Sequence, residues 1–581
     1  MQAWAEEWRS ASVRDEVIAA LTVTLMSVPQ GVAYALIAGL PPAMGLYAGA
    51  IPATLGSLLR SSRHVVSGPT NALSLLVGTS VAAQFDDPVV AATTLALMVG
   101  GLQLLAAGLR LGAIVDYVSA AVVTGYITGA GILIGAGQLK NVTGTTQDRG
   151  DLFTQLSSWA AGLGDTHGPT LALGLSTAVV ILISRRWLGR SVAAMGTIAV
   201  GMVVAYVLDL GSQGVMLVRD LASVPQGLPP FTPPDATLVG RLMPVALAGV
   251  LLSLVESTSV ARSIAGRSGQ RLHLGLEFFG MGVANVAAGL FGGFPVSGSL
   301  SRSALNEQAG ARTRFAGAAT GVLMIAVLLG LGPIVDLMPI ASLAGLLVVV
   351  AVDLVDVRRI RRLLRATMAD RLAFLGTLVG TWVLPLDQAI AVGVGINIVL
   401  FLRQSQVLLV RELQVDEDLR LREVDPDDDE VPDTVRRCRA IRVLHLEGPL
   451  FFGAAGALED ALSYATADRD VKVVVVRMKR AHGLDFTTLE VFAAAHRRLA
   501  SQGRTLLMVG LRANMMRTLH RSGLADTFGE DHVYPTQPGW FVAMNEALTY
   551  ALEQVGEGHD CADCPVQRYV RHRASQPRLA R

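Results

Sequence analysis

The pattern of apolar and polar positions divides the chain into two parts. From about Val17 to Leu402 long apolar runs follow one another with short polar breaks, whereas after Arg403 the sequence changes to charged and alternating patterns typical of soluble protein. A membrane-spanning helix needs about 20 apolar residues, so the first part has room for about fourteen segments. The pattern therefore predicts a polytopic α-helical membrane region, residues 17–402, followed by a water-exposed domain.

The fourteen expected segments form two halves of seven. We place them near residues 17–38, 43–59, 69–83, 89–109, 113–137, 169–184, 191–208, 239–261, 275–292, 298–308, 315–332, 340–355, 371–384 and 387–402.

The positions of the arginines give an orientation, because cytoplasmic loops hold an excess of Lys and Arg. With the N-terminus inside, the expected cytoplasmic loops carry Arg60, Arg63, Arg110, Arg185, Arg186, Arg190, Arg262, Arg267, Arg271, Arg312, Arg314, Arg358, Arg359, Arg361, Arg362 and Arg365. The opposite loops hold chiefly Lys140, Arg149 and Arg219 among several aspartates. We therefore expect an even number of crossings, with both termini in the cytoplasm.

Two segments, 69–83 and 298–308, are too short to span a membrane, and both begin in proline-containing backbone that does not continue as helix. Each is the third segment of its half. Short interrupted segments at corresponding positions of two halves are a sequence indication of a transporter's binding site. The positive ends of two such half-helices, facing each other, would attract an anion. The alternative is a pair of kinked structural helices.

Two charged residues lie inside these apolar segments. Arg302 stands in the first turn of the second short segment, and burying its permanent charge at the bilayer centre costs at least about 2.5 kcal/mol, so it should face a partner such as an anion. The alternative is an arginine whose head group extends to the membrane interface. Glu256 is a carboxyl group deep in an apolar helix. Protonation neutralises such a group readily, which makes Glu256 a candidate proton or cation site, with a structural ion pair to Arg302 as the alternative.

Gln30 and Tyr34 lie one helical turn apart after Pro29 in the first segment. They are candidates to line the same site, although a Gln–Tyr pair that only satisfies neighbouring backbone groups fits the spacing equally well.

Composition restricts the class of protein. Hydrophobic residues make up 51% of the chain and charged residues 16%, with sixty glycines, a formal net charge of +1 and three cysteines. Soluble domains average about 25% charge. A water-soluble protein, a nucleic-acid-binding footprint and a disulfide-stapled fold are therefore disfavoured. No nucleotide-binding P-loop or hydrolase motif is evident, so we expect neither an enzyme nor a cofactor.

Three sequence blocks carry a family resemblance: Val28–Ala35 (VPQGVAYA), Gly39–Tyr47 (GLPPAMGLY) and Ser61–Pro69 (SSRHVVSGP). Together with the Ser299–Arg302 motif, they resemble the SulP sulfate permeases, the bacterial relatives of solute carrier family 26. The resemblance implies a seven-plus-seven inverted repeat with a core and a gate domain, elevator-like movement and a dimer in the bacterial inner membrane.

The resemblance also implies a substrate site. Its contacts would fall on Gln30, Tyr34, Thr70, Leu300, Ser301 and Arg302. Glu256 matches the family's acidic position in the eighth helix, where sodium-using bicarbonate carriers have Asp, so the resemblance favours H⁺ over Na⁺ as the coupling ion. The small Thr70, where several relatives have a bulky residue, leaves room for a larger anion such as a dicarboxylate.

After Arg403 we expect a linker (403–436), an α/β domain (437–555) and a polar tail (556–581). A short cytoplasmic N-terminus (1–16) precedes the membrane region. Strands near 441–446, 471–476 and 504–510 alternate with helices near 454–466, 487–501 and 512–522, as in an α/β layer. This domain resembles the STAS domain that ends SulP transporters. In related anti-sigma-factor antagonists Asp is followed by a phosphorylated Ser or Thr. Asp485 is followed here by Phe486, which disfavours that regulation.

The tail contains Cys561 and Cys564 at CxxC spacing, which supplies only half of a tetrahedral zinc site, so we expect no metal and a reduced pair. The sequence as a whole predicts a secondary transporter of sulfate, bicarbonate or dicarboxylate by proton symport. The alternatives are an anion-sensing membrane regulator that signals through the STAS domain and a sodium-coupled bicarbonate transporter.

Overall fold

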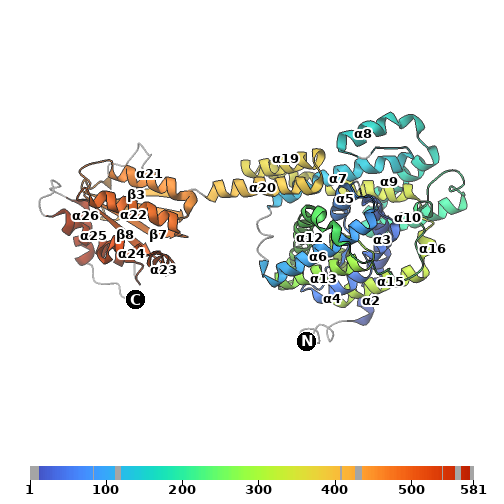
Figure 1. Ribbon diagram of the computed structural model, residues 1–581, viewed down its shortest axis with the longest axis horizontal. Helices are drawn as coiled ribbons and strands as arrows, with labels where there is room; N and C mark the ends of the chain where they lie inside the picture. Colours follow the sequence, from blue (N-terminus) through green and yellow to red (C-terminus); the bar gives the residue numbers. More distant parts are fainter. Residues whose placement is uncertain are drawn as a thin grey trace. The chain divides into compact units, whose positions relative to one another are not determined.

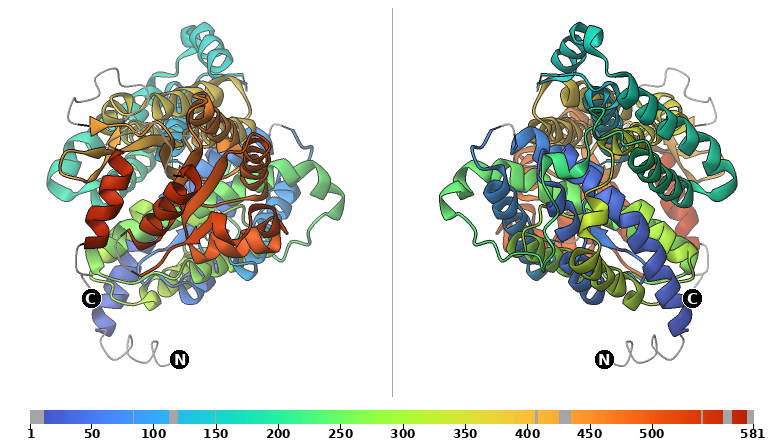
Figure 2. Two further views of the ribbon diagram at one scale, coloured as in Figure 1. Left: turned by 90° about the vertical axis from the view of Figure 1, so that its left-hand side faces the viewer. Right: turned by 90° about the vertical axis from the view of Figure 1, so that its right-hand side faces the viewer.

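The structure, a computed structural model, describes residues 12–82, 84–111, 119–148, 150–405, 408–424, 435–538, 541–556 and 564–575. The chain divides into two compact units, Met1–Ile398 and Val399–Arg581. Figures 1 and 2 show the first as a bundle of helices and the second as a sheet with helices.

Each of the fourteen expected segments corresponds to helix in the first unit, when α3 and α4 are taken together. The helices are α2 (Val13–Ile37), α3 (Pro42–Tyr47), α4 (Ile51–Leu59), α5 (Asn71–Ser80), α6 (Pro88–Gly108), α7 (Ala120–Thr143), α9 (Gly168–Leu188), α10 (Arg190–Val207), α12 (Val239–Ser268), α13 (Leu274–Leu290), α14 (Leu300–Gln308), α15 (Arg314–Gly330), α17 (Ile340–Leu354), α19 (Met368–Val383) and α20 (Leu386–Ser405).

Long apolar helices dominate this unit. Seven helical spans in the described residues are long and apolar enough to cross a membrane, among them α2, α6 and α7, and further apolar helices are shorter. The structure differs from the expectation in the second segment, which breaks between Tyr47 and Ile51 because α4 begins anew with Pro52 near its start. It also adds α8 (Leu152–Ala161) and the arginine-rich α18 (Val357–Leu364) outside the predicted segments.

The helices pack in two groups. In the first, α2 to α6 contact α12 to α15, while in the second α7, α9 and α10 pack with α17 and α19. Small residues allow close contact in the first group: a Cβ atom on Gly100 of α6 would lie 2.5 Å from the backbone nitrogen of Val286 in α13. The two groups correspond to the expected core and gate domains.

The second unit is a seven-stranded sheet with the order β4-β3-β6-β7-β8-β9, and β5 pairs with β3. Its strands are β3 (Leu409–Asp416), β4 (Leu421–Val424), β5 (Val435–Arg436), β6 (Ile441–Pro449), β7 (Val473–His482), β8 (Thr505–Leu511) and β9 (Val533–Pro535). Strands β6 to β9 are parallel, whereas β3 runs antiparallel to β4 and β6.

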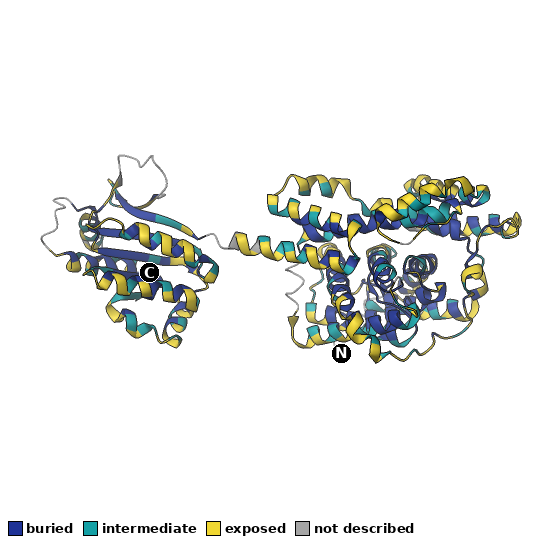
Figure 3. Ribbon diagram, turned by 45° about the horizontal axis from the view of Figure 1, so that its top comes forward, coloured by how far each residue is buried: buried dark blue, intermediate teal, exposed yellow. Residues whose placement is uncertain are grey.

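Helices cover both faces of this sheet. On one face lie α21 (Ala455–Thr466), α22 (Phe486–Ala500), α23 (Ala513–Arg521) and α24 (Ala525–Phe528); on the other lie α25 (Val542–Val555) and α26 (Pro565–Ser575). Because side chains alternate along a strand, Val474 and Val476 of β7 pack under the first set and Val473 and Val475 under the second. The strands are buried and the outer helix faces exposed (Figure 3).

The structure corrects the boundaries of the soluble part. The expected linker, 403–436, contains β3 and β4, because their apolar residues complete the edge of the sheet beside β6. The expected polar tail contains α26, whose Tyr569 is fully buried. Cys564 is also buried, and its Sγ lies 3.6 Å from Sγ of Cys438. Cys561 lies outside the described residues.

Candidate functional site

Two short strands bring the starts of the half-helices α5 and α14 together. Strand β1 (Ser67–Gly68) precedes α5, and β2 (Ser297–Gly298) precedes α14; the two strands pair antiparallel, with Ser67 opposite Gly298. Further bonds join the halves, since Ser299 N donates to Val66 O at 3.1 Å and Val66 N to Ser303 Oγ at 3.0 Å. The N-terminal ends of both half-helices therefore meet inside the first helix group.

Polar side chains of neighbouring helices hold these strands. The side chain of Asn285 in α13 pairs with both backbone groups of Val296, accepting from N at 2.8 Å and donating to O at 3.0 Å. Arg60 Nη2 donates to Ser67 Oγ at 2.6 Å. Neither residue was expected at the site: Arg60 was assigned to a cytoplasmic loop, and Asn285 was not named, although a lone amide inside the apolar segment 275–292 was a local signal for it.

Arg302 is 1% exposed and lies between the half-helices. Its Nη2 donates to Pro69 O, directly before α5, and the guanidinium fits there because Gly68 has no side chain. Its Nε is buried and has no protein hydrogen-bond partner. A side chain this deeply enclosed in protein does not extend to a membrane interface, and its Nε–H is available to a bound group.

Glu256, half-buried in α12, faces the same place. Thr70, the residue directly before α5, donates from Oγ1 to Glu256 Oε2 at 2.9 Å. The Thr70 side chain does not cap its own helix α5 with a hydrogen bond. Its hydroxyl donates to the Glu256 carboxylate instead. Arg302 attracts this carboxylate electrostatically. The hydrogen bond that its guanidinium donates goes to the backbone oxygen of Pro69.

The remaining expected residues lie on α2 and on the first turn of α14. Helix α2 packs against both half-helices; Gln30 and Tyr34 are buried in it, and Oε1 of Gln30 has no protein partner. Tyr34 lies within electrostatic range of Arg302 and Glu256. Leu300, 56% exposed, and the exposed Ser301 form the open side of the site.

The second helix group also reaches α5. Tyr126 of α7 is buried and donates from its hydroxyl to Ala72 O, in the first turn of α5, at 3.1 Å. At the other end of α5, Ser80 Oγ donates to Asp387 Oδ1 at 3.0 Å. Nothing in the local sequence marks Tyr126, because a tyrosine in an apolar helix is ordinarily a packing residue.

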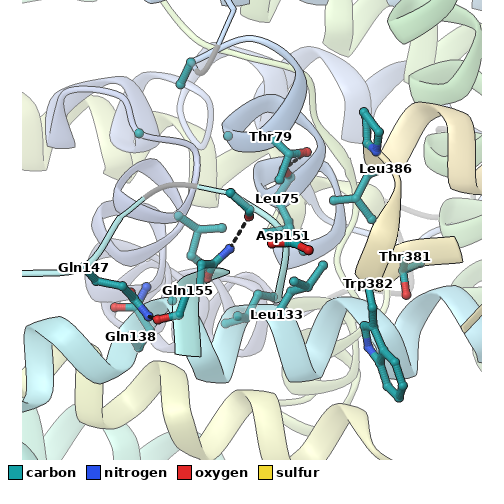
Figure 4. A pocket seen from close by; sticks show the side chains of 18 of the residues that line it. Leu75, Thr79, Leu133, Gln138, Gln147, Asp151, Gln155, Thr381, Trp382 and Leu386 are labelled. Carbon is teal, nitrogen blue, oxygen red and sulfur yellow. Dashed lines mark hydrogen bonds between the residues drawn. The ribbon is translucent and has the colours of Figure 1, made fainter. Parts of the chain in front are cut away.

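A cavity of about 380 Å³ lies between the two helix groups, beyond the middle of α5. Leu75 and Thr79 of α5 line it from one side and Gln138 of α7 and Trp382 of α19 from the other (Figure 4). Thr79 follows Thr70 by about two and a half turns of helix. The cavity therefore lies along α5 past the first turn of this helix, where the site residue Thr70 stands at its start.

The groups gathered at this site determine which ligands it can bind. It combines a fixed cation, two helix N-termini and a carboxyl group that is hydrogen-bonded by a hydroxyl. A cation and helix N-termini suit a small anion. A carboxyl group in the same place suits a proton, because neutralising it removes repulsion between carboxylate and anion.

Comparisons with known proteins agree with this picture. Residues 13–377 match the model of the sulfate permease family, and residues 432–538 match that of the STAS domain. A Mycobacterium tuberculosis protein (strain CDC 1551 / Oshkosh) named "Probable sulfate transporter" is 30% identical over 92% of this chain and 95% of its own. The "Sodium-independent sulfate anion transporter" of Bos taurus is 27% identical over 95% of this chain and 91% of its own.

Solved structures share the fold. The structure of SLC26A9 matches with a TM-score of 0.84 at 18% identity, covering 93% of this chain and 90% of that one. The transmembrane domain of the cyanobacterial bicarbonate transporter BicA matches with a TM-score of 0.57 at 21% identity, over 66% of this chain and 97% of that domain.

Proposed function

The chain belongs to the sulfate permease family, and on that premise we propose that it is a secondary active transporter that carries a small inorganic or carboxylate anion together with a proton. The observation that carries the proposal is the meeting of Arg302, Thr70 and Glu256 where α5 and α14 begin. Membership in the family accounts for the movement of anions, and these three side chains account for recognition and coupling.

The anion binds between the half-helix starts. Arg302 supplies the fixed charge, and its Nε–H is the donor that no protein group uses. Backbone N–H groups in the first turns of α5 and α14 add donors, since the first N–H groups of a helix have no partner within it. Gln30 and Tyr34 contribute side chains from α2, and Leu300 and Ser301 border the open side.

Proton coupling follows from the position of Glu256. An anion next to an ionised carboxylate would be repelled, so anion binding favours the protonated form, and by thermodynamic reciprocity protonation strengthens anion binding equally. The relative from Bos taurus is named sodium-independent, which argues against a sodium ion. The proton is the coupling ion of this proposal.

Transport itself proceeds by movement of the first helix group against the second. The bonds of α5 to Tyr126 and Asp387 are the contacts that such a movement must exchange. We also propose that both chain termini lie in the cytoplasm of a bacterial-type cell. We further expect a homodimer. The molecular mass measured in nanodiscs over a concentration series tests this expectation.

The experiment is uptake of labelled anion by proteoliposomes, with sulfate, bicarbonate, nitrate, chloride and fumarate as competitors. The parent protein should accumulate anion, the Arg302→Gln protein should not, and the Arg271→Gln protein, altered at an exposed arginine beyond α12, should resemble the parent. A protein that binds anion but never moves it would instead be an anion-sensing regulator. Accumulation driven only by sodium would make it a sodium-coupled carrier.

A further inference from the structure

A dense group of arginines stands on α18 (Val357–Leu364), the short helix that follows α17. Five lie within eight positions: Arg358, Arg359, Arg361, Arg362 and Arg365. All except Arg359 recur at spacings of three and four residues, so these four share one face of the helix, the arginine face. Like charges at this spacing repel one another and destabilise a helix. The arginine face therefore calls for a counter-charge.

The described part of the protein does not supply this counter-charge. All five side chains are exposed, and none of them has a hydrogen bond or an ion pair with another described residue. The aspartates of residues 353–371 are engaged in an ion pair with Arg185 and in the first turns of α18 and α19: Asp353, Asp356 and Asp370. The same stretch holds six arginines against these three aspartates, so an excess of positive charge remains.

The turn between α9 and α10 extends the cationic surface. Arg185 Nη1 lies 3.0 Å from Asp353 Oδ1, and this ion pair joins the end of α9 to the end of α17. Arg186 and Arg190, on either side of the turn, are exposed, and no acidic residue stands between them. The excess charge of α18 is therefore increased, not balanced, by its neighbour.

The same ion pair places α18 at the level where membrane meets water. Helix α9 is long and apolar enough to cross a membrane, and its last turn carries Trp187, which is 77% exposed. Tryptophan is enriched at membrane–water interfaces. Because α17 ends beside this turn and breaks at Val355 and Asp356, α18 begins near the same level.

The side of α18 away from the arginines is apolar. Val357, Ile360 and Leu364 share it, again at spacings of three and four residues. Val357 is 57% exposed and Leu364 39%, so this side is only partly covered by protein. A helix with basic residues on one face and apolar residues on the other lies in the plane of the interface, its apolar face toward the acyl chains. A free inorganic anion would need no such face, whereas a lipid uses both.

We propose that the arginine face of α18 binds the phosphate head groups of anionic phospholipids in the leaflet that this helix borders. A guanidinium forms paired hydrogen bonds with phosphate oxygens. Lipids with a net negative charge are preferred over zwitterionic ones, because the negative surface potential of an anionic leaflet attracts basic residues beside it. Since α18 packs against α19, the bound lipid anchors the second helix group in the bilayer. This binding does not depend on the proposed anion transport, whose site lies in the first helix group.

The test measures lipid binding by the full-length protein in a nonionic detergent. The protein is titrated with ¹⁴C-labelled phosphatidylglycerol, which is anionic, or with ¹⁴C-labelled phosphatidylcholine, which is zwitterionic, and the label bound to protein is counted. The parent should bind phosphatidylglycerol more tightly, and high salt should reduce the difference. The triple variant Arg358→Gln, Arg361→Gln, Arg362→Gln should bind it about a hundredfold more weakly, because each basic residue beside an anionic surface contributes a factor of about five.

Two further variants separate the position of the charge from its amount. Replacing three exposed arginines of the soluble unit by Gln removes the same charge and should leave lipid binding as in the parent: Arg469, Arg498 and Arg521. Replacing the same three arginines of α18 by Lys keeps the charge and should keep most of the affinity. Without lipid, the Gln variant of α18 should be at least as stable as the parent, because glutamine is a good helix former and the repulsion is removed.

Several results would overturn the proposal. Equal affinity of the parent for the two lipids would do so, as would the parent's affinity for phosphatidylglycerol in the Gln variant of α18 with normal thermal unfolding. An equal loss of binding in the soluble-unit variant would assign the effect to net charge rather than to α18. A lower melting temperature of the α18 Gln variant in the absence of lipid would assign the arginines to a contact within the protein.

Discussion

Replacing Thr70 by Val tests the bond on which proton coupling depends. Valine has nearly the shape of threonine, so the replacement removes the hydroxyl that donates to Glu256 Oε2 at 2.9 Å and little else. A hydrogen bond to a charged group contributes about 1.5–3 kcal/mol and one to a neutral group about 0.5–1.5 kcal/mol, so this bond stabilises the ionised carboxylate by about 1–1.5 kcal/mol more than the neutral acid. Without it the neutral, anion-binding form is favoured.

The size of the effect follows directly. One pH unit corresponds to about 1.36 kcal/mol of difference between two protonation states, so losing a difference of about 1–1.5 kcal/mol moves the midpoint by about one unit. The midpoint moves to higher pH, because the ionised carboxylate loses a stabilising hydrogen bond and therefore takes up its proton more readily. The pH at which anion transport falls to half should therefore rise by about one unit in the Thr70→Val protein.

The assay is initial uptake of labelled sulfate by proteoliposomes over a series of external pH values. Thr70→Ser keeps the hydroxyl and should keep the midpoint of the parent. The maximal rate is not the readout, because Thr70 also borders the proposed anion site and its loss lowers uptake at every pH. A Thr70→Val protein whose midpoint coincides with that of the parent, with transport still proton-driven, would refute the proposed bond between Thr70 and the titrating group.

Further predictions concern other parts of the chain. Arg302→Gln should leave thermal unfolding nearly unchanged and weaken anion binding at least tenfold, measured by equilibrium dialysis; unchanged affinity would remove Arg302 from the site. Truncation after Ser405, before β3 begins, should leave a membrane unit that binds anion with the parent's affinity but transports it at an altered rate. Glu16→Ala should lower the melting temperature, because its carboxylate accepts from the N–H groups of Arg312 and Thr313 and leaving buried donors unpaired costs about 1–3 kcal/mol each. Tyr569→Ala should destabilise the soluble unit by about 3–5 kcal/mol in chemical denaturation if α26 is packed on the sheet, whereas an unpacked tail would show no change.

The helices were predictable because lipid imposes a simple rule on sequence. Every spanning segment must be long and apolar, so both ends of α6 and the start of α12 follow from hydropathy. Helix α12 continues to Ser268, past the expected end at 261, because its last residues are polar and carry no apolar signal. The interrupted starts of α5 and α14 were equally visible, since proline and glycine mark them. Arg302 and Glu256 stood out for the same reason, because a charge in an apolar segment has few structural explanations.

What the sequence could not give depends on contacts between distant residues. The bond of Tyr126 to Ala72 and the contact of Cys438 with Cys564, 126 positions apart, arise only when the chain has folded. Strand β3 was hidden as well, because its apolar residues stand among charged ones and their partners lie on β6. A single charge or proline is visible in the local sequence, whereas a contact between two distant residues leaves no pattern in the sequence around either one.

The central claim is that Arg302 and Glu256 make this chain a proton-coupled anion carrier, and uptake under an imposed gradient tests it most directly. Proteoliposomes containing the parent or the Glu256→Gln protein receive labelled sulfate with an inward proton gradient, an inward sodium gradient or neither. The account predicts concentrative uptake with the proton gradient alone, and in the Glu256→Gln protein only equilibration of anion at every pH. Uptake that follows the sodium gradient and ignores pH, or concentrative proton-driven uptake that survives Glu256→Gln, would contradict it.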